Sequence, residues 1–158
     1  MHDIIEVNPG FHPPRPTGPA RVGQSAPAAI DFVLPATPMQ IAAARRQVTT
    51  CLAHWNLDCL SDDAALITSE LVTNAVLHAE AETITVFLVR CGTPASPKLL
   101  ITVTDTSSSE CIPSATPPAG LEESGRGLYI LTCLTTCWGT VNSKSGKLVW
   151  AMLGMDAQ

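Results

Sequence analysis

The sequence predicts a two-layer α+β domain in which helices pack on one face of a mixed, mostly antiparallel sheet. Two observations lead to this class. Apolar residues recur at spacings of three and four in two segments, residues 38–55 and 61–78, which is typical of amphipathic helices. After them come short runs rich in Val, Ile, Leu and Thr, bounded by Gly and Pro, which are typical of strands joined by turns.

Residues 1–28 are expected to be a flexible, Pro-rich tail, because they contain six prolines and three glycines and little periodic apolar pattern. The folded domain is then expected over residues 29–155. It begins with a strand at 30–34, which Pro35 ends.

Two helices should follow. Thr37 is expected to cap the first, with Pro38 at its first position and Trp55 near its end. The second starts at Ser61, where Asp62 and Asp63 suit the positive end of the helix dipole, and runs to about His78.

The second half supplies most of the sheet. Its strands are expected at 83–89, 99–105, 138–141 and 147–153, with a further helix at about 127–137. Residues 106–123 are rich in Ser and Pro and too long for an ordinary connection in a compact domain. We therefore expect a mobile lid there.

Composition and charge limit the functions that this chain can have. The 158 residues suffice for one domain, and 46% hydrophobic against 15% charged residues indicates a packed core. A net charge of −5 without a basic cluster disfavours direct nucleic-acid binding. Because no leader pattern and no run of about 18 apolar residues occurs, we expect a cytoplasmic protein without a membrane span.

The cysteines are expected to be free thiols, since no CxxC pair occurs. Cys133 and Cys137 lie four residues apart on the third expected helix. A metal site shared with His54 or His78 is one interpretation, and packing as small hydrophobic residues is the other.

A polar ridge follows the second helix. Glu70, Asn74 and His78 are each four residues apart, which places them within an arc of about 80°. Apolar neighbours such as Ile67 and Leu71 put this ridge at the edge of the buried face, where a pocket would form. On an arbitrary helix, the same pattern would be a solvated stripe.

A carboxylate ends the strand at 99–105. Asp105 shares strand parity with Leu99, Ile101 and Val103, so its side chain should point to the buried face. There it would need a partner or a ligand. Alternatively, Asp105 caps the turn that follows it.

A glycine turn comes before the third helix, at Ser124-Gly125-Arg126-Gly127-Leu128. Two such glycines permit close backbone approach, and the N–H groups of a helix N-terminus can bind phosphate oxygens. A flexible hinge would have the same composition.

The order of these three elements resembles the Bergerat ATP-binding fold, which gyrase B, histidine kinases and the mismatch-repair ATPase share. The stretches LPATPMQIAAARRQV, DDAALITSELVTNAVLHA, ITVTDTSS, ESGRGLYIL, CWGT and KLVWAML are similar to those of anti-sigma-factor serine/threonine kinases, in particular the stand-alone regulators of actinobacterial type. The resemblance covers about residues 30–153.

This resemblance implies a set of roles for the site residues, with ATP and Mg²⁺ as cofactors. Glu70 would be the general base and Asn74 the Mg²⁺ ligand, while Asp105 would accept a hydrogen bond from the adenine amino group. The remaining residues would lie along the phosphates: His78, Gly125, Arg126, Gly127 and Leu128. An amide oxygen together with phosphate oxygens is a plausible Mg²⁺ shell.

This sequence differs from the family pattern at two places that bear on the implied ATP site. Thr106 to Ser109 replace the glycine-containing motif that commonly follows the strand aspartate. Leu148 stands where relatives commonly have a threonine beside the adenine, and losing that hydrogen bond would weaken ATP binding by about 0.5–1.5 kcal/mol.

The resemblance implies a regulatory ATP-binding protein: an anti-sigma factor that phosphorylates a Ser or Thr of an anti-sigma-factor antagonist. Its partners would be a sigma factor or that antagonist, and relatives of this type often form homodimers. Two alternatives remain. One is a catalytically weak or inactive nucleotide-binding module that sequesters a partner, and the other is a metal or thiol-redox protein that uses Cys133 and Cys137.

Overall fold

The structure is a computed structural model that describes residues 28–78, 81–105, 123–143 and 146–154. Within these ranges, the side chains of residues 78, 123–128 and 142–143 are outside the description. The tail expected at 1–28, apart from residue 28, and the lid expected at 106–123, apart from residue 123, also lie outside the described residues.

Five strands, three α-helices and one short 3-10 helix make up the described chain. In sequence order they are β1 (Ala29–Pro35), α1 (Gln40–His54), η1 (Asp58–Leu60), α2 (Ser61–His78), β2 (Thr83–Thr93), β3 (Ser96–Asp105), α3 (Glu123–Leu134), β4 (Cys137–Ser143) and β5 (Gly146–Gly154). Each expected strand and helix is present, and the β2–β3 hairpin extends further toward its turn than the sequence predicted.

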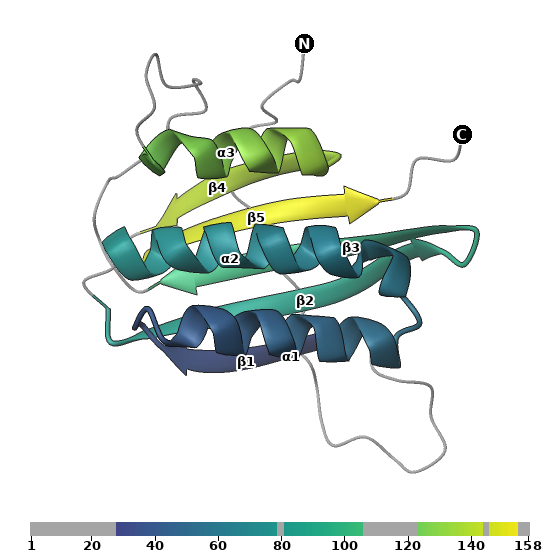
Figure 1. Ribbon diagram of the computed structural model, residues 1–158, viewed down its shortest axis with the longest axis horizontal. Coiled ribbons are helices and arrows are strands. Elements are labelled where there is room, and N and C mark those ends of the chain that lie inside the picture. The colour runs from purple at the N-terminus through teal and green to yellow at the C-terminus, as the bar shows by residue number, and fades with distance from the viewer. Residues whose placement is uncertain (1–27, 79–80, 106–122, 144–145, 155–158) are drawn as a thin grey trace.

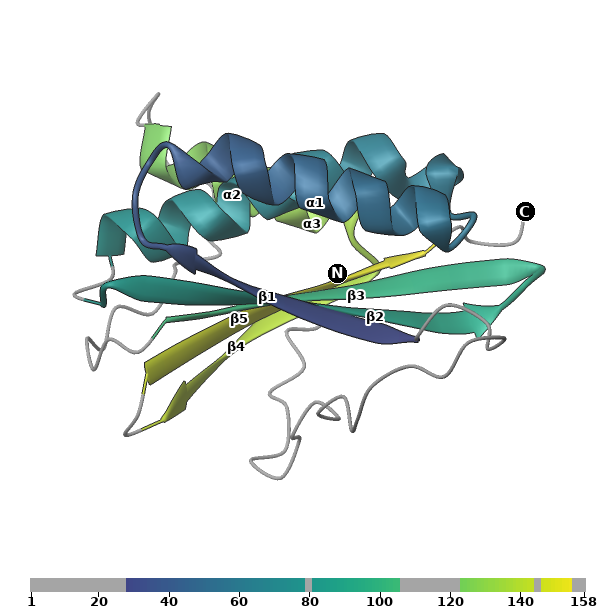
Figure 2. The same ribbon diagram turned by 90° about the horizontal axis from the view of Figure 1, so that it is seen from below.

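The strands form one sheet in the order β1-β2-β3-β5-β4. All three α-helices lie side by side on one face of this sheet (Figures 1 and 2). The predicted two-layer α+β class is therefore confirmed. The sheet is antiparallel at each of its four described pairings, so the parallel component expected of a mixed sheet is not found in the described strands.

The core lies between the sheet and α2, the central helix, which contacts α1, α3, β2, β3 and β5. Both layers contribute side chains with at most 2% exposure: Ala64, Ile67, Leu71 and Val72 from α2, and Leu99, Ile101 and Val103 from β3. Each large aliphatic side chain buried in this way contributes about 1.5–3 kcal/mol. Because rotating α2 would expose these residues, the core fixes the direction in which its polar ridge points.

The start of α1 differs from the prediction. The helix begins at Gln40, and its N-cap is Met39, without a side-chain cap hydrogen bond. The backbone N–H of Gln40 donates to the Thr37 carbonyl at 3.0 Å, and that of Ile41 donates to the Pro38 carbonyl at 3.3 Å. Backbone carbonyls, and not the Thr37 side chain expected to cap the helix, therefore accept from the N–H groups at its start.

The third helix also starts earlier than expected, at Glu123 instead of about Gly127, and ends at Leu134. Gly125 and Gly127 thus lie inside the helix instead of in a turn before it. Glu123 is favourable in a first turn because its charge suits the helix dipole, and a glycine costs a helix only about 1 kcal/mol. In the described part of the chain, no helix is both long and apolar enough to cross a membrane.

Candidate nucleotide site

Three elements that carry candidate site residues meet at one end of the molecule. The C-terminal end of α2, the end of β3 and the N-terminal end of α3 lie together at the left of Figure 1. The strand register agrees, because Asp105 pairs with Ile84 at the start of β2, which follows soon after α2, and with Lys147 at the start of β5. Residues far apart in the sequence are therefore gathered at this end.

The polar ridge of α2 sits at the edge of the core, as the sequence predicted. Glu70 and Asn74 are half-buried, one helical turn apart, between fully buried neighbours such as Leu71. Burial raises the pKa of the Glu70 carboxyl by desolvation. A carboxylate with a raised pKa is a better proton acceptor at neutral pH, as a general base requires. His78 ends the helix, and its side chain is outside the description.

Asp105 points to the helix-covered face, as the strand parity predicted. It is 7% exposed and lies beyond the buried side chains of Ile101 and Val103 on the same strand. Its Oδ1 accepts a hydrogen bond from the backbone N–H of Lys147 at 3.4 Å, which is a long bond. The turn that Asp105 would alternatively cap lies outside the described residues.

The interpretation of Leu148 is corrected by the register of β5. Leu148 pairs with Thr104, whereas Lys147 pairs with Asp105. Because side chains alternate between the faces of a sheet, Leu148 lies on the face opposite to Asp105. The lack of a hydroxyl at Leu148 therefore carries no weight against nucleotide binding.

Lys147 is the residue at this site that the sequence-based reasoning missed. It is 8% exposed and lies on the helix-covered face opposite Asp105. Its parity with Val149, Ala151 and Leu153, all buried, was the signal that could have identified it. Lys147 therefore brings a positively charged side chain to the face that carries Asp105, which a threonine would not.

The glycine segment supplies backbone groups to the same end. Gly125 and Arg126 lie in the first turn of α3, where N–H groups have no partner within the helix. Such groups, together with the helix dipole, favour an anion. Of the roles predicted for Arg126, Gly127 and Leu128 along a triphosphate, the structure describes only the backbone, which is helical at all three residues.

The described residues provide few ligands for a divalent cation in the absence of a nucleotide. They contain no group of three or more His, Cys, Asp and Glu that could hold a metal ion. Cys133 is exposed and Cys137 half-buried, and both are free thiols. A cation at Asn74 would thus need further oxygen ligands, and the phosphates of a nucleotide are the kind that Mg²⁺ commonly uses.

Comparison with known families decides which family this chain belongs to. The model of the histidine kinase-like ATPase domain matches residues 34–152, which extend from the end of β1 almost to the end of β5. The chain belongs to this family. Membership in the histidine kinase-like ATPases supports an ATP-binding role.

Solved structures include similar chains. One is described as the histidine kinase domain from Erythrobacter litoralis EL346 blue-light activated histidine kinase, with 16% identity and a TM-score of 0.45. The match covers 84% of this chain and 66% of that one, so this chain spans slightly less than two thirds of the other. No curated protein matches the sequence.

Proposed function

We propose that this histidine kinase-like ATPase domain is an anti-sigma factor that binds ATP and Mg²⁺ and phosphorylates a Ser or Thr of an anti-sigma-factor antagonist. The observation that carries this proposal is the arrangement at one end of the sheet. Glu70 and Asn74 lie half-buried on one ridge of α2, and the buried Asp105 carboxylate ends β3 at the same end. The ATPase-domain match to residues 34–152 covers all three.

These residues fit ATP·Mg²⁺ in chemical type. Asp105 offers a buried carboxylate, which suits the amino group of an adenine, and Asn74 offers an amide oxygen, which suits Mg²⁺. When bound, the nucleotide would supply the phosphoryl group and the Mg²⁺ would neutralise its charge.

Glu70 would act on the protein substrate. Its carboxylate would accept the proton of the attacking Ser or Thr hydroxyl, and its raised pKa suits that proton transfer near neutral pH. The backbone N–H groups at the start of α3 would orient the phosphate oxygens.

Phosphorylation of the partner tests this role. The protein is incubated with labelled ATP and a candidate antagonist, and Glu70→Gln is compared with wild type. We expect the labelling rate to fall about 100-fold or more, the usual contribution of a general base. Asp63→Asn, at an exposed carboxylate in the first turn of the same helix, is the matched control and should label normally. Labelling that is unchanged in Glu70→Gln would refute the role of Glu70.

A second candidate function is a nucleotide-binding or degenerate module that sequesters its partner without phosphoryl transfer. The buried Lys147 favours it, because a cation opposite Asp105 competes for the carboxylate that would recognise adenine. Pull-down of the sigma factor or antagonist with and without ATP separates the two functions. Partner binding that is unchanged by ATP and by the Asn74→Ala substitution would favour the second candidate function.

A further inference from the structure

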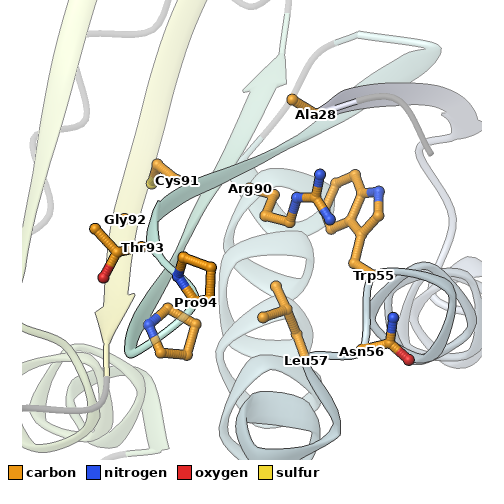
Figure 3. A pocket seen from close by; sticks show the side chains of 10 residues that line it. Ala28, Trp55, Asn56, Leu57, Arg90, Cys91, Gly92, Thr93 and Pro94 are labelled. Atoms are coloured by element: carbon orange, nitrogen blue, oxygen red, sulfur yellow. The ribbon is translucent and has the colours of Figure 1, made fainter. Parts of the chain in front are cut away.

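A cavity lies at the opposite end of the sheet from the candidate nucleotide site. It has a volume of about 600 Å³ and lies between the β2–β3 hairpin and the segment that follows α1 (Figure 3). Pro97, which lines the cavity, lies 8 residues before Asp105 on β3. At about 3.4 Å per residue, the two are about 27 Å apart along the strand. The cavity is therefore separate from the family's nucleotide site.

The walls of this cavity combine apolar and polar surface in nearly equal parts. Trp55 and Leu57 follow α1, and their side chains are only 4% and 5% exposed because both pack into the hydrophobic core. Between them, Asn56 has a φ of 56°, which turns the chain sharply enough for its two neighbours to line the same cavity. Pro94 and Pro97 from the hairpin add rigid apolar surface to the lining.

One cationic side chain, that of Arg90, lines this cavity. Arg90 shares strand parity with Val86 and Leu88, so it projects to the helix-covered face, and Figure 3 shows it extending toward the Trp55 indole. Its backbone N–H donates to the Ala28 carbonyl at 2.7 Å, which fixes the strand at the cavity rim.

No anionic group of the described chain balances Arg90 in the cavity. None of the described lining residues is Asp or Glu, and no ion pair joins Arg90 to a described acidic residue. Cys91 also lines the cavity, and desolvation raises the pKa of its thiol, so it remains uncharged at neutral pH. A half-buried guanidinium with an aromatic face and rigid apolar walls beside it matches a ligand that has one negative charge and an apolar body.

We propose that this cavity is a second ligand site, which binds an organic carboxylate through Arg90 and holds its apolar body against Trp55, Leu57, Pro94 and Pro97. Arg90 presents a planar fork of N–H donors, which can bind both oxygens of a carboxylate at once. A surface arginine in water would show little preference for such a ligand. The carboxylate could belong to a free small molecule or to the C-terminus of a protein chain. This proposal does not depend on ATP binding or on kinase activity.

The test titrates the ¹⁵N-labelled full chain with 4-phenylbutyrate and follows its tryptophan indole N–H signals by NMR. Saturable binding with a Kd of about 1 mM or tighter is expected for a ligand of this size. The indole signal of Trp55 should shift, whereas those of Trp138 and Trp150 should not. The neutral 4-phenylbutyramide should bind at least about tenfold more weakly, because it cannot form the charge-assisted pair.

Arg90→Met keeps the apolar stem and removes the charge, and it should weaken 4-phenylbutyrate binding at least about tenfold. Arg45→Met, at an exposed arginine on α1, is the matched control and should bind as wild type does. The comparison of acid with amide uses the unaltered protein, so it decides the matter even if Arg90→Met does not fold. Equal affinity for acid and amide, or no saturable shift at Trp55 with any carboxylate probe, would overturn the proposal.

A second arm separates the two sources of the carboxylate. The peptide Ala-Ala-Leu-Leu is titrated with a free C-terminus and as its C-terminal amide. Binding of the free acid at least about tenfold tighter than 4-phenylbutyrate, and lost in the amide, would identify a chain terminus. Binding of 4-phenylbutyrate but not of the peptide acid would identify a free small carboxylate.

Discussion

Replacing Asp105 with Asn should weaken ATP binding strongly. The side chain is 7% exposed and lies on the helix-covered face at the end of β3, where a nucleotide base would meet a carboxylate shielded from water. The substitution keeps the shape of the side chain. It removes the negative charge and can turn an acceptor atom into an N–H₂ donor, which cannot accept from the adenine amino group.

The expected loss follows from the strength of one charge-assisted hydrogen bond. Such a bond contributes about 1.5–3 kcal/mol, which corresponds to about a 10- to 150-fold increase in the Kd of ATP at about 1.4 kcal/mol per factor of ten. The bond that Asp105 accepts from the Lys147 N–H is 3.4 Å long, so its loss should contribute little to the change.

Calorimetric titration with ATP measures this effect, and urea unfolding of the same samples checks the fold. The control is Thr104→Val, one residue earlier in β3 and on the opposite face, where the Thr104 hydroxyl donates to the Thr85 carbonyl at 3.4 Å. That variant should bind ATP within about twofold of wild type. If Asp105→Asn also binds ATP within about twofold of wild type, the carboxylate does not contact the base and the reasoning fails.

Three further predictions concern stability, measured by urea unfolding. Ile101→Ala removes a side chain with 0% exposure from the core and should lower the free energy of unfolding by about 2–5 kcal/mol. The control Val33→Ala, at a residue with 59% exposure, should lower it by less than about 0.5 kcal/mol. Equal effects of the two substitutions would contradict the assigned core. Thr68→Val should raise stability by about 1 kcal/mol, because the buried Thr68 hydroxyl has no hydrogen-bond partner among the described residues; a loss would show that this hydroxyl is satisfied. Burial raises the pKa of Glu70, so the folded wild type loses stability as the pH rises through that raised pKa. Glu70→Gln should be more stable than wild type at neutral pH, and the gap should close below the ordinary pKa of about 4.3; a gap that widens toward acid pH would contradict the assigned cause.

The features that the sequence predicted well are those that depend on a local period. A helix places residues four apart on one ridge, so the positions of Glu70 and Asn74 at the edge of the core followed from their spacing and from the apolar residues beside them. Strand alternation likewise predicted that Asp105 faces the core.

Other features depend on contacts between distant segments, and local patterns do not determine these. Which residue lies beside Asp105 is set by the register between β3 and β5, and a shift of one residue exchanges Leu148 for Lys147 and one face for the other. The cavity at Arg90 and Trp55 forms only when the hairpin packs near the end of α1. Helix starts were also missed, because a backbone turn replaced the side-chain cap expected from Thr37.

The central claim is that the polar ridge of α2 binds nucleotide through Mg²⁺. Calorimetric titration of wild type and Asn74→Ala with ATP, with and without Mg²⁺, tests it most directly, and Gln47→Ala on the exposed side of α1 is the matched control. The account predicts that wild type and Gln47→Ala bind ATP more tightly with Mg²⁺, and that Asn74→Ala loses this dependence on Mg²⁺. ATP binding that is equally tight in Asn74→Ala, or no binding to wild type under either condition, would contradict it.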